Sequence, residues 1–211
     1  MNRRADVRDT YDRIAAHFAS TREYAWPEVE SFLEGRTGSV GLDLGCGNCR
    51  HAELLAARCD RVVGLDVSRG LLEAGRARAA DREFAVSLLQ GDAAALPLRE
   101  GAVGLAVYVA TLHHLPTRED RLSSLNELAR VLAADGAGLV SAWSTAHDRF
   151  DRDDGFDTTV EWTLPGGETV DRFYHIYAPE EFVADLEASE LVLEEWELSS
   201  GNCYAVVGGE E

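Results

Sequence analysis

Residues 40–50 read VGLDLGCGNCR, an apolar run followed by an acid and a Gly-x-Gly turn. Outward from this segment, short apolar runs alternate with stretches of helical periodicity, and this alternation indicates a mainly parallel sheet with helices on both faces. The run at 103–109 is apolar at almost every position, as expected for a strand covered on both faces. We therefore expect an α/β fold with a single doubly wound, mainly parallel seven-stranded sheet.

The predicted strands and helices follow from the periodicity of apolar residues and from the turn-forming residues between them. Strands are expected at 39–44, 61–65, 87–90, 103–109, 137–143, 191–198 and 204–207. Helices are expected at 7–18, 27–33, 51–57, 69–79, 122–132 and 179–187, the first of them with Asp6 as N-cap.

No linker composition divides the 211 residues, so we expect one domain with four parts. Residues 1–37 form a helical segment on the substrate side, and 38–143 form the core. Residues 144–178 break the strand–helix rhythm and are interpreted as an irregular insertion. Residues 179–211 supply a last helix and a hairpin.

The charge is strongly acidic and unevenly distributed. The chain has 38 acids and 20 basic residues, all of them arginine, for a net charge of −18; residues 148–211 alone hold 18 acids and three arginines. An acidic interaction tail is one explanation, but apolar residues are interleaved with these acids. We favour a halophilic, archaeal protein, because concentrated salt screens such self-repulsion. We expect no DNA partner.

The four cysteines, with no secretory signal at the N-terminus, favour free thiols and a cytoplasmic protein. No apolar run approaches 18 residues, so neither a membrane span nor a membrane partner is expected. Cys46 and Cys49 form a C-x-x-C, but zinc normally requires four ligands and the other two cysteines form no second pair. We expect no metal.

The candidate ligand site lies at the ends of the first three predicted strands. Gly45 and Gly47 allow the backbone to approach a ligand closely, although Arg50 stands where a dinucleotide fingerprint has its third glycine. Asp43, Asp66 and Asp92 each occur at the end of a successive strand. Three such acids around one turn favour a ligand site over three ordinary turns, and they suit a cationic cofactor better than a pyrophosphate.

The segments VGLDLGCGNCR, VVGLDVS, LLQGDAAALPL and LAVYVATLHHL resemble the class I S-adenosylmethionine-dependent methyltransferases over about residues 38–143. The resemblance implies a Rossmann-like fold and S-adenosylmethionine as cofactor, with S-adenosylhomocysteine as product. It implies that the glycine turn, including Cys46, approaches the amino-acid part, that Asp66 holds the ribose and that Asp43 orients the methionine end. Asp92 and Ala93 would bind the adenine edge, and Val109 belongs to the same site.

A narrower resemblance extends over nearly the whole chain. YDRIAAHFASTREYAWPEV, ATLHHL, SAWS, VEW, RFYHIY and GNCYAVV are similar to the tRNA wobble-uridine methyltransferases. These enzymes esterify a carboxymethyl group on uridine, so tRNA is the implied substrate. Implied catalytic residues are Arg22, His113 and His114. We expect Arg8, Arg13, Arg22, Tyr174, His175 and Asn202 to bind the substrate. Arg8 and Arg13 belong to an arginine-bearing N-terminal segment that should face the phosphates, whereas Tyr174 and His175 are equally compatible with core packing.

Other interpretations of these residues remain open. The cofactor half is equally compatible with a small-molecule methyltransferase of the quinone-precursor type, or with a non-catalytic cofactor-binding partner. The two histidines at the end of a strand are about as compatible with a structural role as with catalysis. Arg22 is either a surface arginine or a clamp on a carboxylate or phosphate, for which its planar fork is suited.

The resemblance also implies a protein partner, a small zinc-binding activator subunit. Strand 86–90, Val-Ser-Leu-Leu-Gln, is expected at a sheet edge and contains no charge, proline or glycine. Exposed edges are normally blunted by such residues or covered. We expect the activator to form a heterodimer by adding a strand there, unless a segment of the chain itself covers the edge.

Overall fold

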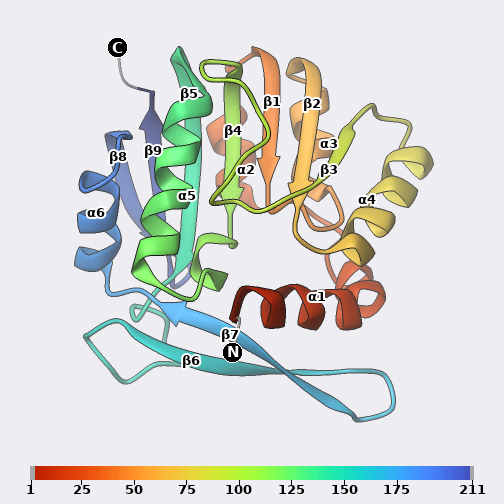
Figure 1. Ribbon diagram of the computed structural model, residues 1–211, viewed down its shortest axis with the longest axis vertical. Helices are drawn as coiled ribbons and strands as arrows, with labels where there is room; N and C mark the ends of the chain where they lie inside the picture. Colours follow the sequence, from red (N-terminus) through yellow and green to blue (C-terminus); the bar gives the residue numbers. More distant parts are fainter. Residues whose placement is uncertain (1–2, 210–211) are drawn as a thin grey trace.

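The computed structural model describes residues 3–209, and its centre is a seven-stranded sheet in the order β3-β2-β1-β4-β5-β9-β8 (Figure 1). The first five strands of the sheet are parallel, whereas β9 pairs antiparallel with β5 and with β8. The strands are β1 Gly38–Leu44, β2 Cys59–Asp66, β3 Ser87–Gln90, β4 Val103–Val109, β5 Leu132–Trp143, β8 Val192–Ser199 and β9 Asn202–Gly208. The expected doubly wound sheet is confirmed.

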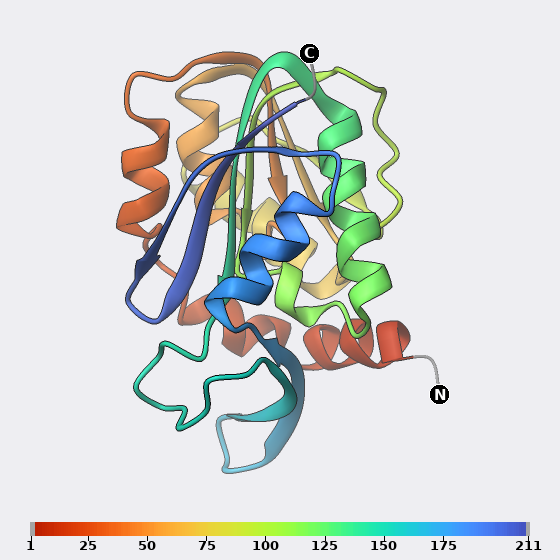
Figure 2. The same ribbon diagram turned by 90° about the vertical axis from the view of Figure 1, so that its left-hand side faces the viewer.

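Helices cover both faces of this sheet, as the alternation predicted. On one face lie α2 Pro27–Leu33, α3 Arg50–Ala56 and α4 Arg69–Asp81; on the other lie α5 Arg118–Val131 and α6 Pro179–Glu187 (Figure 2). Each face has its own apolar core, and β4 contributes to both because its alternate side chains point in opposite directions. No helix within residues 3–209 is long and apolar enough to cross a membrane.

The predicted irregular insertion is wrong, because residues 144–178 contain an antiparallel hairpin. Its strands are β6 Phe156–Thr163 and β7 Thr169–Ile176, paired in register from end to end. Inward and outward positions alternate along β7, with Val170 and Ile176 buried and Asp171 exposed. The hairpin forms its own two-stranded sheet, and its inward face is buried against other elements rather than in the main core.

Helix α1, Arg3–Ser20, lies with this hairpin across the end of the sheet where the parallel strands terminate (Figure 1). It begins before Asp6, so Asp6 lies in the first turn and is not the N-cap we expected. Asp12 fixes the position of α1, since its Oδ1 accepts hydrogen bonds from Ser68 Oγ at 2.7 Å and from Gly70 N at 2.9 Å. Gly70 allows the close approach, because a Cβ there would lie 2.8 Å from Ala15 Cβ.

Asp12→Ala should release α1 from the start of α4. Two hydrogen bonds to a carboxylate are lost, so we expect a cost of about 1–3 kcal/mol in unfolding free energy. Ligand affinity at the pocket beneath α1 should also fall. Denaturant unfolding and calorimetric titration measure the two effects. Asp9→Ala is the matched control, because Asp9 pairs only with its exposed neighbour Arg8 among the contacts described. Equal behaviour of the two variants would contradict this role of Asp12.

Candidate functional site

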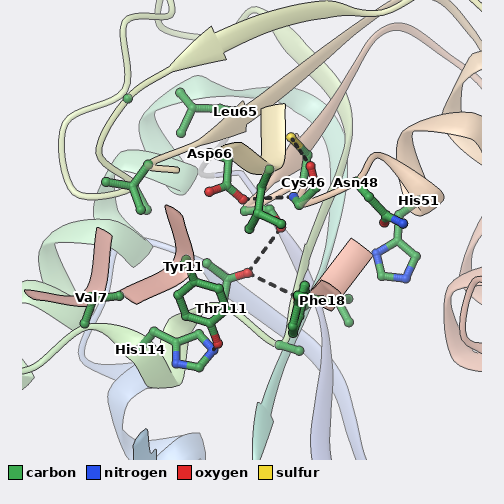
Figure 3. A pocket seen from close by; sticks show the side chains of 18 of the residues that line it. Val7, Tyr11, Phe18, Cys46, Asn48, His51, Leu65, Asp66, Thr111 and His114 are labelled. Atoms are coloured by element: carbon green, nitrogen blue, oxygen red, sulfur yellow. Dashed lines mark hydrogen bonds between the residues drawn. The ribbon is translucent and has the colours of Figure 1, made fainter. Parts of the chain in front are cut away.

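A pocket opens where the parallel strands end, beneath α1 (Figure 3). Its walls come from α1, the turn after β1, the ends of β2 and β4, the loop after β3, and the 3-10 helix η1 Leu112–His114. Figure 3 shows Asp66 and Cys46 toward one end, and Tyr11 and His114 toward the other. The elements that the sequence placed at one edge of the sheet therefore meet around one cavity.

The glycine turn holds the ends of three strands together. Gly45 and Gly47 have φ values of 72° and 52°, a region that favours glycine. The amides of Gly45 and Cys46 both donate to Leu65 O, at 2.7 and 3.0 Å. A Cβ at Gly45 would lie 2.1 Å from Thr111 Oγ1, whereas a Cβ at Gly47 would meet nothing within 4 Å. The first glycine is needed for strand packing and the second leaves open space in the pocket wall.

Asp66 is fixed at the end of β2 with one oxygen bonded on each side. Its Oδ2 accepts from Gly47 N at 2.9 Å and its Oδ1 from Ser68 N at 2.8 Å. Burial raises the pKa of Asp66 to about 6, although these amides oppose the shift. Each carboxylate oxygen keeps a lone pair for a further donor. The side chain can therefore accept hydrogen bonds from two adjacent hydroxyls, as the ribose assignment requires.

The loop after β3 and the end of β4 contribute the remaining predicted cofactor residues. Asp92, Ala93 and Val109 all line the pocket, and Asp92 Oδ1 accepts from Ala94 N at 2.9 Å. Between Asp66 and Asp92 the lining is largely apolar, from Leu65, Val67 and Leu71. Such a slot suits a flat aromatic base with a polar edge.

Asp43 is not among the residues that line the pocket, so an effect on the methionine end would be indirect and stays a prediction. Its Oδ2 accepts from Ala52 N at 2.9 Å, which ties β1 to the first turn of α3. Complete burial raises the pKa of Asp43 to about 7. The residue acts behind the glycine turn by positioning the helix that follows it.

Two arginines and a histidine line the same pocket near the glycine turn. Asn48 Nδ2 donates to Arg22 O at 2.9 Å, which holds the Arg22 loop against the turn. Burial, then the nearby Arg22, lowers the pKa of Arg50 to about 10. His51 Nε2 is buried without a hydrogen-bond partner among the described residues, and burial lowers the pKa of His51 to about 3. No sequence pattern predicted that Arg50 and His51 belong to this site.

The predicted catalytic histidines have different environments. His114 lines the pocket; its Nδ1–H donates to Phe173 O at 2.9 Å, so its Nε2 accepts the Tyr11 hydroxyl at 2.8 Å. His113 is buried outside the pocket lining, and its Nδ1 accepts from Trp143 N at 2.9 Å. Burial lowers the pKa of both histidines, to about 4 for His114. Both rings are therefore neutral, and His113 braces β5 rather than facing a ligand.

Three predicted substrate residues lie away from the pocket lining. His175 bridges Asp157 and Glu181, at 2.8 and 2.9 Å, and so attaches the hairpin to α6. Asn202 Nδ2 donates locally to Ser200 O at 3.3 Å. Tyr174 is buried behind His114, with ring centroids 4.4 Å apart. These side chains are engaged within the protein, and their contact with the substrate stays a prediction.

The two arginines predicted on α1 are exposed and paired. Arg8 pairs with Asp9 at 2.8 Å, and Arg13 pairs with Glu168 in the turn of the β6–β7 hairpin. Arg13 therefore helps to join the hairpin to α1. In residues 3–209 no three His, Cys, Asp or Glu side chains are grouped so as to hold a metal, and the four cysteines are free.

The residues present fit S-adenosylmethionine. Asp66 offers acceptors for ribose hydroxyls, the apolar slot ends in Asp92 and Ala93, and His51, whose Nε2 has no partner among the described residues, follows the Arg50 guanidinium on the pocket wall. An α-carboxylate would match these cationic and polar groups. The fold and this set of donors and acceptors define a nucleoside-binding α/β domain with an anion-binding end.

Comparison with known proteins agrees with a site for S-adenosylmethionine. The methyltransferase domain family matches residues 42–140. The chain is 36% identical to a mouse tRNA (carboxymethyluridine(34)-5-O)-methyltransferase over 65% of its own length and 20% of that protein's. It is 34% identical to the Saccharomyces cerevisiae protein of that name, over 75% of the chain and 57% of the yeast protein. A putative methyltransferase of Encephalitozoon cuniculi is 32% identical, with 81% and 79% covered.

Solved structures share the fold at lower identity. A DhpI–S-adenosylhomocysteine complex matches with a TM-score of 0.70 and 19% identity, over 97% of this chain and 95% of that one. A complex between the Haloferax volcanii Trm112 methyltransferase activator and a putative methyltransferase matches with a TM-score of 0.70 and 15% identity, over 97% and 98%. The chain belongs to the class I S-adenosylmethionine-dependent methyltransferases.

Cofactor affinity should depend on pH through Asp66. Ribose hydroxyls bind best to the ionised carboxylate, so a pKa near 6 in the free protein means that affinity is full above about pH 7. Below pH 6 the affinity should fall by up to about tenfold per pH unit. The Asp66→Asn variant should bind the cofactor more weakly at neutral pH, by about 1–3 kcal/mol, and its affinity should no longer fall between pH 7 and pH 5. Calorimetric titration of both proteins from pH 5 to 8 measures it. Identical pH profiles would exclude Asp66 as the titrating group.

Proposed function

We propose that this methyltransferase esterifies the carboxymethyl group of a wobble uridine in tRNA. The names of the mouse and yeast relatives support this substrate. The observation that carries the proposal is the chemistry of the pocket wall formed by α1, the loop after it and His114. This wall offers the Arg22 guanidinium, while His114 has hydrogen bonds at both of its nitrogens. It can orient an anion, and neither nitrogen of His114 is free to act as a general base.

A carboxylate acceptor needs no general base. Its pKa is near 4, so the nucleophilic oxygen is already ionised at neutral pH. S-adenosylmethionine, when bound, supplies a methyl group on a positively charged sulfonium. The chain's own contribution is then to position and desolvate the acceptor. An acceptor that had to lose a proton, such as an amine or a phenol, would call for a base that these neutral, bonded histidines do not provide.

Arg22 is suited to orient the acceptor without neutralising it completely. Its guanidinium lies 4.6 Å from the Phe18 ring centroid and 5.5 Å from that of Trp162, so the aromatic rings limit its motion. Burial lowers the pKa of Arg22. A partly desolvated cation attracts a carboxylate strongly. Too tight an ion pair between Arg22 and the acceptor carboxylate would stabilise the ground state more than the transition state.

Arg22→Met should lower the turnover of a carboxymethyluridine anticodon stem-loop by at least about tenfold, with a much smaller effect on cofactor affinity. Arg22→Lys keeps the charge but not the planar fork of donors, so its turnover should lie between those of wild type and Arg22→Met. Transfer of a labelled methyl group measures turnover, and mass analysis of the nucleosides identifies the ester. Labelling of small acceptors but not of tRNA would favour a small-molecule methyltransferase, and no labelling of any acceptor would favour a non-catalytic cofactor-binding protein.

The proposal includes a protein partner at β3, which lies at one end of the sheet. Leu88 and Leu89 are only half-buried and pack against opposite cores. A strand from a small zinc-binding activator would complete the backbone hydrogen bonding and cover both leucines. The activator complex of the Haloferax volcanii methyltransferase, which has the same fold, supports a partner of this kind.

Replacing Ser87 with proline and Leu89 with aspartate should abolish co-purification with the activator and lower the activity. The first change removes a backbone donor and the second places a charge in the buried contact. Leu198→Asp is the matched control, because Leu198 is a 46% exposed leucine on β8 at the opposite edge. A wild-type chain that is fully active alone and gains nothing from the activator would refute the partner.

A further inference from the structure

Arg172 occupies a position in β7 where the alternating pattern calls for an apolar side chain. It lies between Val170 and Tyr174 on the inward face of the hairpin and is only 7% exposed. Its Nη1 donates to the Tyr174 hydroxyl at 2.7 Å, but its Nε is buried without a partner, and no carboxylate of residues 3–209 forms an ion pair with it. A buried guanidinium without a counter-ion is costly, because burial removes its hydration.

Arg172 and Arg22 approach the same indole ring from different elements. The Arg172 Cζ lies 4.8 Å from the Trp162 ring centroid, and the Arg22 Cζ lies 5.5 Å from it. Trp162 is held in place by its Nε1–H, which donates to His17 Nδ1 at 3.1 Å. One aromatic side chain therefore connects a cation on the pocket wall with a cation buried behind it.

The polar groups around these two arginines are neutral or cationic. Arg172 donates to the Tyr174 hydroxyl and Tyr11 donates to His114, and the rings of Tyr11 and Tyr174 both pack against the His114 ring. Among the described residues, no hydrogen bond or ion pair joins a carboxylate to the side chain of Arg22 or of Arg172. We call Arg22, Arg172, Trp162, Tyr174, Tyr11 and His114 the acid-free cluster.

The acid-free cluster is unexpected in this chain. The net charge is −18, and residues 148–211 hold 18 acids against three arginines, of which Arg172 is one. The other two, Arg149 and Arg152, lie at partly or fully exposed positions over Trp143 and Phe156. With acids so abundant, a counter-ion for Arg172 could readily occur on the hairpin. Its absence leaves a positive potential at the end of the pocket that an anionic ligand can neutralise.

We propose that Arg172 is a specificity-determining positioning residue, whose uncompensated charge makes the Arg22 end of the pocket selective for an ionised carboxylate. The inference rests on the proposed function, since it concerns the same acceptor. Arg22 touches the acceptor, while Arg172 acts from behind through its charge and by fixing Tyr174 and Trp162. An uncharged amide in the same place gains nothing from the charge. The methyl ester product is also neutral, so the same selectivity favours its release.

The test compares two anticodon stem-loops that differ at one group, carboxymethyluridine and carbamoylmethyluridine. Their dissociation constants are measured on the full chain, with S-adenosylhomocysteine present and with the activator if the chain requires it. Wild type should bind the acid at least about tenfold more tightly than the amide. Arg172→Gln keeps a donor for Tyr174 but loses the charge, so the acid-to-amide ratio should fall to near one. Arg172→Lys keeps the charge and should retain most of the ratio.

Arg152→Met is the matched control, because Arg152 is an exposed arginine of the same insertion, with its Cζ 4.4 Å from the Phe156 ring centroid. It should leave the ratio unchanged. A purely structural Arg172 predicts that Arg172→Gln lowers Tm and weakens both ligands equally. If Arg172 instead acts through its unpaired charge, Arg172→Gln should have a Tm at least equal to that of wild type and unchanged cofactor affinity, and should lose only the preference for the acid.

The outcomes separate the two hypotheses. If wild type neither methylates the acid stem-loop nor binds it better than the amide, the proposed function fails. If wild type prefers the acid and Arg172→Gln keeps the same preference, the role of Arg172 is refuted while the function stands. If Arg172→Gln does not fold, the Lys variant decides: a ratio as low as one in a folded, cofactor-binding Arg172→Lys protein overturns the proposal, and a retained ratio supports it.

Discussion

The site depends on the connection between the end of β1 and the end of β2. Gly45 and Cys46 donate to Leu65 O, and Gly47 donates to Asp66, so the glycine turn and the carboxylate fix each other. Both backbone segments would otherwise carry unsatisfied polar groups at a buried sheet edge. Asp43 adds a bond to the first turn of α3 from behind. The cofactor pocket is therefore organised by backbone hydrogen bonds that exist before any ligand binds, which lowers the cost of binding.

The side of the pocket opposite the sheet is built from segments outside the Rossmann-like core, namely α1 and the β6–β7 hairpin. Helix α1 is tied to α4 by Asp12, and the β6–β7 hairpin is tied to α1 by Arg13 and by the Trp162–His17 hydrogen bond. The core supplies the cofactor face, whereas α1 supplies Tyr11, the loop after α1 supplies Arg22, and the hairpin supplies the buried groups behind them. This division explains how one cofactor-binding fold can serve different acceptors, because the acceptor side is carried by separate segments.

Charge has a different distribution at the surface and at the site. Acids dominate residues 148–211, yet the cluster around Arg22 and Arg172 contains no paired carboxylate. Surface acids are solvated and cost little, whereas an acid beside Arg172 would neutralise the field that an anionic acceptor requires. The histidines there are kept neutral by burial and by nearby cations. The proposed function uses this pocket wall to orient a negative charge and not to move a proton.

The sequence by itself determined the sheet, its flanking helices and the grouping of Gly45, Gly47, Asp66 and Asp92 around one pocket, because short-range periodicity and glycine turns at strand ends encode them locally. It did not determine the β6–β7 hairpin, whose polar alternation resembles a loop until α1 covers its inward face. Nor could it separate His113 from His114, because adjacent residues diverge only once the 3-10 helix turns one toward the pocket and the other toward β5. Asp43 and Asp66 likewise look equivalent in the chain, and only the packing of α3 decides which faces the ligand. Arg172 could not be singled out from the sequence, because burial without a counter-ion depends on which side chains the fold brings together and not on any sequence pattern.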